Sequence, residues 1–169
     1  MWDRDREASR IADQLRRALM GGDDEEGQGE AWHGPAVETL LLDVDAAQAA
    51  ARPIPGAHSI WEIFQHMTVW LETVRVRLVE DRPYDPTAGE NWSEVTDASE
   101  SAWQGLQERH RRAGDALEEV IEQLPDRRLE LGVAGKAYNG YVMLHGIIQH
   151  ELYHAGQIAL LKRALGLIR

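Results

Sequence analysis

The segment 59–80 carries the strongest structural signal in this chain. Ser59 followed by Glu62 forms a capping box, in which two side chains satisfy backbone N–H groups at the start of a helix. Apolar residues then recur every three or four positions, which is the spacing of a helix that buries one face. They are Ile60, Ile63, Phe64, Met67, Trp70, Leu71, Val74 and Leu78. The segment therefore predicts a long amphipathic helix that ends near Asp81 and Pro83.

Three other segments show the same helical period, and almost no strand pattern is visible. They are 4–20, ended by Gly21 and Gly22; 97–124, ended by Pro125; and 140–165, with Gly166 as its C-terminal cap. Four long helices in 169 residues predict an all-α fold, a four-helix bundle that occupies 1–169 as a single domain.

The connections between these helices are predicted to differ in character. Two short helical pieces, at 35–42 and 44–51, are expected between the first and second long helices. The acidic, Gly-rich stretch 21–30 is expected to be a flexible loop. The polar segment 82–96 is expected to be a loop with one anchor, Trp92.

Charge and composition exclude several classes of function. The formal net charge of −11 disfavours nucleic acid as a partner, because an acidic surface repels a phosphate backbone. The chain has no cysteine, which excludes disulfides, a cysteine nucleophile and thiolate metal ligands. No apolar run reaches about 18 residues, and WDRDREASR is too charged for a signal peptide, so we expect no membrane partner and a cytoplasmic location.

The motif HELYH at 150–154 matches the His-Glu-x-x-His signature of zinc peptidases. On a helical wheel His150 and His154 lie in the apolar stripe, beside Ile147 and Ile158. Two neutral imidazoles on one buried face would each need hydrogen-bond partners, and two charged ones would repel each other. A metal ion removes this difficulty because it accepts a lone pair from each ring.

The rest of the chain argues against a peptidase. Only 15 residues follow His154, and none of them is His, Asp or Glu, so a third ligand must come from an earlier helix. Zinc peptidases also place their motif helix beneath a β-sheet, and no strands are predicted. We therefore interpret His150 and His154 as two metal ligands on a bundle helix.

The best third ligand is His66, at the margin of the apolar stripe of the 59–80 helix. That position suits a ligand at the edge of a cleft, although the pattern is equally compatible with a histidine that faces solvent. His110 lies on the core side of the 97–124 helix. It is expected to be either a buried histidine satisfied by hydrogen bonds or a group behind the metal ligands.

Three stretches resemble the DinB-like superfamily of small metal-binding four-helix bundles. They are GEAWHGPAVETLL (29–41), IPGAHSIWEIFQHMTVW (54–70) and YVMLHGIIQHELYHAGQIALLKRALG (141–166), the last with the pattern H-x-x-x-H-x-x-Q. The resemblance implies one divalent metal ion, zinc, nickel or iron(II), held by His66, His150 and His154. It also singles out Gln157, whose amide would bind a ligand ring or a metal-bound water, or else bridge two helices.

The resemblance also implies an activity. Three neutral imidazoles leave the metal its charge and at least one open position, which suits the activation of water or a thiol. Relatives include transferases and isomerases that use a low-molecular-weight thiol, and others that look like hydrolases. We therefore expect a metal-dependent transferase or hydrolase acting on a small molecule. A non-catalytic ligand-binding or stress-response module and a closed structural metal site are the alternatives.

Glu151, Tyr138 and Tyr141 also have expected places around this site. Glu151 has the offset of a peptidase general base, but the helical pattern favours a surface or dimer-edge position for it. Tyr138 and Tyr141, with Asn139, precede the last helix and are expected to line the mouth of a pocket. The resemblance also implies a homodimer that forms through bundle faces. A second, weaker apolar stripe on the 59–80 helix is compatible with such an association, and it consists of Trp61, Val69, Val76 and Val79.

Overall fold

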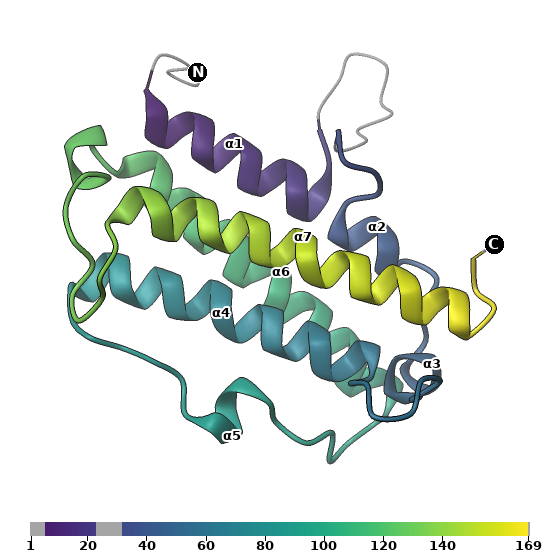
Figure 1. Ribbon diagram of the computed structural model, residues 1–169. Coiled ribbons are helices and arrows are strands. Elements are labelled where there is room, and N and C mark those ends of the chain that lie inside the picture. Colours follow the sequence, from purple (N-terminus) through teal and green to yellow (C-terminus); the bar gives the residue numbers. More distant parts are fainter. Residues whose placement is uncertain (1–5, 23–31, 169) are drawn as a thin grey trace.

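The computed structural model describes residues 6–22 and 32–168, and within these ranges the fold is helical (Figure 1). The predicted flexible loop at 21–30 falls almost entirely outside them. The helices are α1 (Glu7–Met20), α2 (Val37–Leu41), α3 (Ala46–Ala50), α4 (Ile60–Glu80), α5 (Ala88–Asn91), α6 (Glu100–Gln123) and α7 (Gly140–Ala164), with a 3-10 turn at Asp126–Arg128. An isolated antiparallel bridge joins Gly132 to Asn139.

The four longest helices, α1, α4, α6 and α7, lie side by side around one apolar core (Figure 1). Helix α6 packs against α1 and α4, and α7 packs against the same two helices from the other side. Their inward faces supply most of the fully buried side chains, which include Ile11, Leu15, Phe64, Met67, Leu71, Trp103, Leu117 and Ile158. The prediction of an all-α fold is confirmed.

Helices α4 and α6 run in the same direction, so the chain must travel back along the molecule between them (Figure 1). This return connection, 81–99, passes beside α4 and carries α5, which packs against α4. The sequence predicted only a loop here. Thr87 and Glu90 form a capping box at the start of α5, and this sequence pattern is the signal for the missed helix.

Local signals fixed both ends of α4 and the end of α7. Ser59 Oγ accepts the N–H of Glu62 and the Glu62 carboxylate accepts the N–H of Ser59, as the capping box predicts. Asp81 ends α4 with a positive φ of 45°, and Gly166 follows α7 with a φ of 75°. At Gly114, α6 lies so close to α1 that an added Cβ would be 2.7 Å from Leu19 Cδ1.

The second apolar stripe on α4 does not form a continuous exposed surface. Trp61 is buried at 5% exposure, with its ring 5.1 Å from that of Trp103 in α6. Val79, at the other end of the stripe, is 55% exposed. The helical wheel placed Trp61 on this second stripe, but the ring is buried because removal of its large apolar surface from water is favourable. Among the described helices, none has the length and apolar character needed to cross a membrane.

Candidate metal centre

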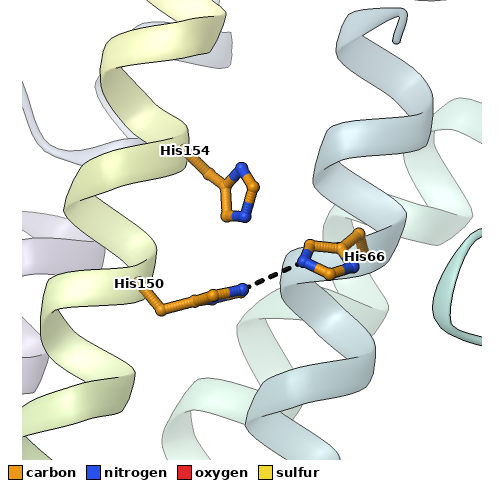
Figure 2. Close-up of side chains that lie close together, drawn as sticks. All are labelled: His66, His150 and His154. Carbon is orange, nitrogen blue, oxygen red and sulfur yellow. Dashed lines mark hydrogen bonds between the residues drawn. The ribbon is translucent and has the colours of Figure 1, made fainter.

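Helices α4 and α7 bring together the three predicted metal-binding histidines. His66 extends from α4, and His150 and His154 extend from successive turns of α7 into the same space (Figure 2). Their potential ligand nitrogens all lie within 4.8 Å of one another. Nε2 of His66 is 3.0 Å from Nε2 of His150. Two helices that are far apart in the sequence thus turn three ring nitrogens toward one space.

Each of the three rings turns its Nδ1 toward an oxygen of the protein. The contacts are His66 Nδ1 to the Asn91 carbonyl at 3.0 Å, His154 Nδ1 to Gln157 Oε1 at 2.6 Å, and His150 Nδ1 to Glu151 Oε1 at 3.5 Å. An oxygen acceptor favours the tautomer with its hydrogen on Nδ1. Each ring then keeps its lone pair on Nε2. The three lone pairs are therefore available for one shared cation.

This geometry fits a metal ion. Two imidazoles on a tetrahedral ion, with metal–nitrogen distances of ~2.0–2.1 Å, have their nitrogens roughly 3.3 Å apart. The 3.0 Å between the Nε2 atoms of His66 and His150 is close to that value. Two lone pairs at such a distance repel each other unless a cation lies between them. The donor set, three imidazoles, suits zinc, nickel or iron(II).

Burial keeps these rings in the form that binds metals. Loss of solvation lowers the pKa of His66 to about 4 and the pKa of His150 to about 4, and it also lowers the pKa of His154. The three imidazoles are therefore neutral near pH 7. A metal ion would not have to displace protons from them.

The return connection completes the surroundings of His66. The Trp92 ring lies between two imidazoles, stacked on His66 at 4.0 Å and on His58 at 3.9 Å. Asn91 accepts from His66 through its carbonyl and from Trp70 Nε1 through its side chain, at 2.8 Å. The sequence did not assign Asn91 or His58 to the site. Trp92 was identified only as an anchor of the loop.

A cavity of about 630 Å³ opens directly onto the three histidines. Its wall includes Ile63, Trp70, Trp92 and Leu161, with Gln157 among its polar groups. Such a volume and an apolar wall with a few polar groups are typical of small-molecule sites. A ligand in this cavity would therefore meet a metal held by the three histidines.

Glu151 does not occupy the surface or dimer-edge position that the helical pattern favoured. Its side chain is fully buried, at 0% exposure, on the Nδ1 side of His150. Burial raises the pKa of its carboxyl well above the ordinary value. Successive helix residues differ by about 100° around the helix axis, and this angle placed Glu151 at the side of the apolar stripe and not within it. Its side chain extends inward between the helices toward His110 of α6 and is covered there.

Behind Glu151 lies His110, which the sequence placed correctly on the core side of α6. His110 Nδ1 donates to Thr68 Oγ at 3.2 Å, and the Thr68 hydroxyl donates to the Phe64 carbonyl. The lone pair on His110 Nε2 then faces Glu151 Oε2 at 3.8 Å. Burial lowers the pKa of His110 to about 3. Thr68, His110, Glu151 and His150 thus follow one another in the core, but no hydrogen bond joins His110 Nε2 to Glu151 Oε2, and both atoms are buried without a hydrogen-bond partner among the described residues.

Replacement of Glu151 by glutamine should separate its effect on metal affinity from its effect on folding. Glutamine keeps both hydrogen-bonding positions but removes the ability to carry a negative charge beside His150. We expect metal affinity to fall about tenfold, the lower end of the range for groups that support a ligand. The melting temperature of the metal-free protein should not fall, because a buried ionisable group is replaced by a neutral one.

The measurement is a competition titration of metal against a chelator, with Glu130→Gln, an exposed position, as the matched control. Equal affinities in wild type and Glu151→Gln would show that the carboxyl has no part in metal binding.

Acid should destabilise the metal-free protein between pH 6.5 and 5. In the unfolded chain, imidazoles take up protons near pH 6.5. In the folded chain the pKa is about 4 for His66 and His150 and about 3 for His110. The unfolded state therefore binds more protons in this range. The free energy of unfolding falls as pH falls, by at most about 1.4 kcal/mol per pH unit for each group.

The raised pKa of Glu151 acts in the opposite direction, because the folded state then holds the extra proton. Glu118, whose pKa is raised to about 7 by burial, acts in the same direction as Glu151. Two carboxyls thus oppose the four histidines with lowered pKa values, and the histidines set the net sign. Thermal melting in a chelator at pH 7 and pH 5 measures the effect. A melting temperature that is equal or higher at pH 5 would contradict it.

The remaining predicted pocket residues take different places. Gln157 is half-buried at the cavity and accepts from His154. Tyr138 is half-buried and its hydroxyl accepts from Arg77. Tyr141 is 40% exposed and packs against His145. The predicted role of Tyr141 at a pocket mouth stays a prediction.

Comparison with known proteins gives one match. The model of the DinB superfamily matches residues 31–158, a range that includes all three histidines. No curated protein and no solved structure matches the chain. The matched range covers most of the chain, from the residues before α2 into the second half of α7. This protein belongs to the DinB superfamily.

Proposed function

We propose that the protein is a metal-dependent enzyme that activates a small thiol or a water molecule. In this proposal His66, His150 and His154 hold one divalent ion, and the reaction is a thiol-dependent transfer or a hydrolysis. The scaffold is a four-helix bundle of the DinB type, which the packing of α1, α4, α6 and α7 supports.

The orientation of the three rings is the observation that carries the proposal. Each Nδ1 has an oxygen acceptor from a different residue, and each Nε2 is left toward the common space. A neutral imidazole has one N–H donor and one nitrogen lone pair, and the oxygen contact at Nδ1 satisfies only the donor. The lone pairs on the three Nε2 atoms are left without a donor among the described residues, which packing alone does not explain. The oxygen contacts at Nδ1 are the usual supporting contacts of metal-bound histidines.

An open coordination position is supported by the carboxylates near the site. Glu62 lies one turn before His66 on α4, but its carboxylate binds Ser59 and Arg52 and does not face the three histidines. Glu151 faces Nδ1 of His150 instead of Nε2. Within the described parts of the chain the group that could hold an ion contains only the three histidines. Three protein ligands with a free position are typical of catalytic sites.

The residues around the histidines would then have defined tasks. Asn91 and Gln157 hold the rings of His66 and His154 in place, and Trp92 covers one face of His66. The apolar wall of the 630 Å³ cavity excludes water from a bound molecule. A bound metal lowers the pKa of a coordinated thiol or water, which is the chemistry the site lacks without it.

The test is to load the purified protein with zinc, nickel or iron(II) and measure turnover of electrophilic, ester and amide substrates with and without low-molecular-weight thiols. Turnover that requires added thiol supports the transferase, and turnover without thiol supports the hydrolase. Metal binding without turnover, together with tight binding of small apolar molecules, would replace the proposal by a non-catalytic ligand-binding module.

A further inference from the structure

A second cavity, of about 290 Å³, lies between α4 and α7 next to the metal cavity. The two cavities share Trp70 and His150 in their walls. The second one extends from there toward the start of α7, between apolar side chains that include Val74, Met143 and Ile147. We name this cavity the α4–α7 groove. A molecule bound in it would lie against a metal ligand at one end.

The other end of the groove is formed by Arg77, a cation that the fold buries. Its side chain is only 2% exposed. The guanidinium donates to the Tyr84 carbonyl at 2.8 Å, to Tyr138 Oη at 3.1 Å and to Asp85 Oδ1. It also lies 5.5 Å from the centre of the Trp70 ring. The charge is thus fixed in position beside the groove.

The positive charge at this end is not fully compensated. Asp85 binds Arg77, but Lys136 Nζ also donates to both Asp85 oxygens, at 2.6 Å each. Two cations therefore share one carboxylate. Tyr138 Oη accepts a hydrogen from Arg77, and we find no acceptor for its own hydroxyl hydrogen in the described ranges. An anion here would gain a fixed charge and a hydroxyl donor.

We propose that the α4–α7 groove binds the substrate of the metal site, and that this substrate is an amphipathic carboxylate. Its apolar body lies along Val74 and Ile147, its carboxylate reaches Tyr138 and Arg77, and its reactive end lies near His150. Seven residues of α4 separate Trp70 from Arg77, a rise of about 10 Å, which sets the length of the molecule. The assignment of substrate rests on the proposed function, whereas binding in the groove does not.

The groove is tested with octanoate, 1-octanol and octyltrimethylammonium, titrated calorimetrically into the metal-free full-length protein. Absence of metal prevents the carboxylate from binding at the histidines instead. We expect octanoate to bind about tenfold more tightly than octanol, because a charge-assisted hydrogen bond is available only to the carboxylate. Octyltrimethylammonium should bind more weakly than octanol.

Three variants locate the binding. Arg77→Met keeps the apolar length and should remove the preference for octanoate over octanol. Tyr138→Phe removes only the hydroxyl and should reduce that preference without affecting octanol. Gly146 lies in the groove wall, and nothing lies within 4 Å of an added Cβ. Gly146→Leu should therefore fill the groove, fold normally and weaken both ligands at least fivefold.

Zinc binding measured in parallel separates this proposal from the metal proposal. All three variants should bind zinc as wild type does, since Arg77, Tyr138 and Gly146 form no hydrogen bond with any of the three histidines. Equal affinities of wild type for octanoate and octanol would overturn the proposal. So would octanoate binding that requires zinc and survives Arg77→Met, or that survives Gly146→Leu. A wild type that binds octanoate as expected but no metal would refute the proposed function alone.

Discussion

Replacement of His154 by alanine is expected to leave the protein folded but unable to retain a divalent metal ion. His154 supplies one of the three nitrogens that converge in the described part of the chain, and its removal leaves two ligands on different helices. The loss should exceed the ~10–100-fold typical of a residue that merely supports a ligand. His66→Ala should have the same effect, because it also leaves only two ligands, His150 and His154 of α7. Metal analysis after dialysis against a weak chelator measures both.

His145→Ala is the matched control for these variants. His145 belongs to the same helix as His154, but it packs against Tyr141 and is not part of the three-histidine group. Its removal should leave metal content at the wild-type level. If all three variants retained metal equally, the ion would have to bind elsewhere, and the proposed centre would be refuted.

Replacement of Trp103 by alanine is expected to cost about 3–5 kcal/mol of unfolding free energy, the usual range for a fully buried aromatic. Trp103 has 0% exposure in α6 and packs its ring against Trp61 and Phe64 of α4. Its indole N–H also donates to the Val44 carbonyl at 2.8 Å, which would lose that partner. This loss is a large share of the roughly 5–15 kcal/mol that stabilises a typical domain.

Urea unfolding followed by circular dichroism measures the effect of Trp103→Ala. Trp32→Ala removes the same side chain from a position that is fully exposed, and it should change stability by less than about 0.5 kcal/mol. A loss of similar size in both variants, or less than about 1 kcal/mol for Trp103→Ala, would show that the contact between α4 and α6 does not depend on this ring.

The long helices were predictable because their signals are local. The capping box at Ser59 and Glu62 and the apolar period after it placed the start and end of α4 within one residue. The first helix begins at Glu7 and α6 begins at Glu100, three residues later than predicted in each case. Helix ends depend on caps, and Ser99 was not identified as the cap of α6.

The candidate site was only partly predictable. His150 and His154 stood out because their spacing puts both on one face of a helix, but His66 was ambiguous until the resemblance to a family was considered. The contact of His66 with Asn91 and Trp92 depends on the path of the return connection, which no local pattern specifies. The burial of Glu151 likewise depends on how the long helices pack around the core, where its carboxyl faces His110 of α6.

X-ray absorption at the metal edge of the zinc- or nickel-loaded protein tests the central claim most directly. The account predicts three imidazole ligands at about 2.0–2.1 Å, with a light-atom ligand from solvent in the open position. The His154→Ala protein, if it retains any metal, should show fewer imidazoles. A spectrum of the wild-type protein with no imidazole, or with only one, would contradict a centre built from His66, His150 and His154.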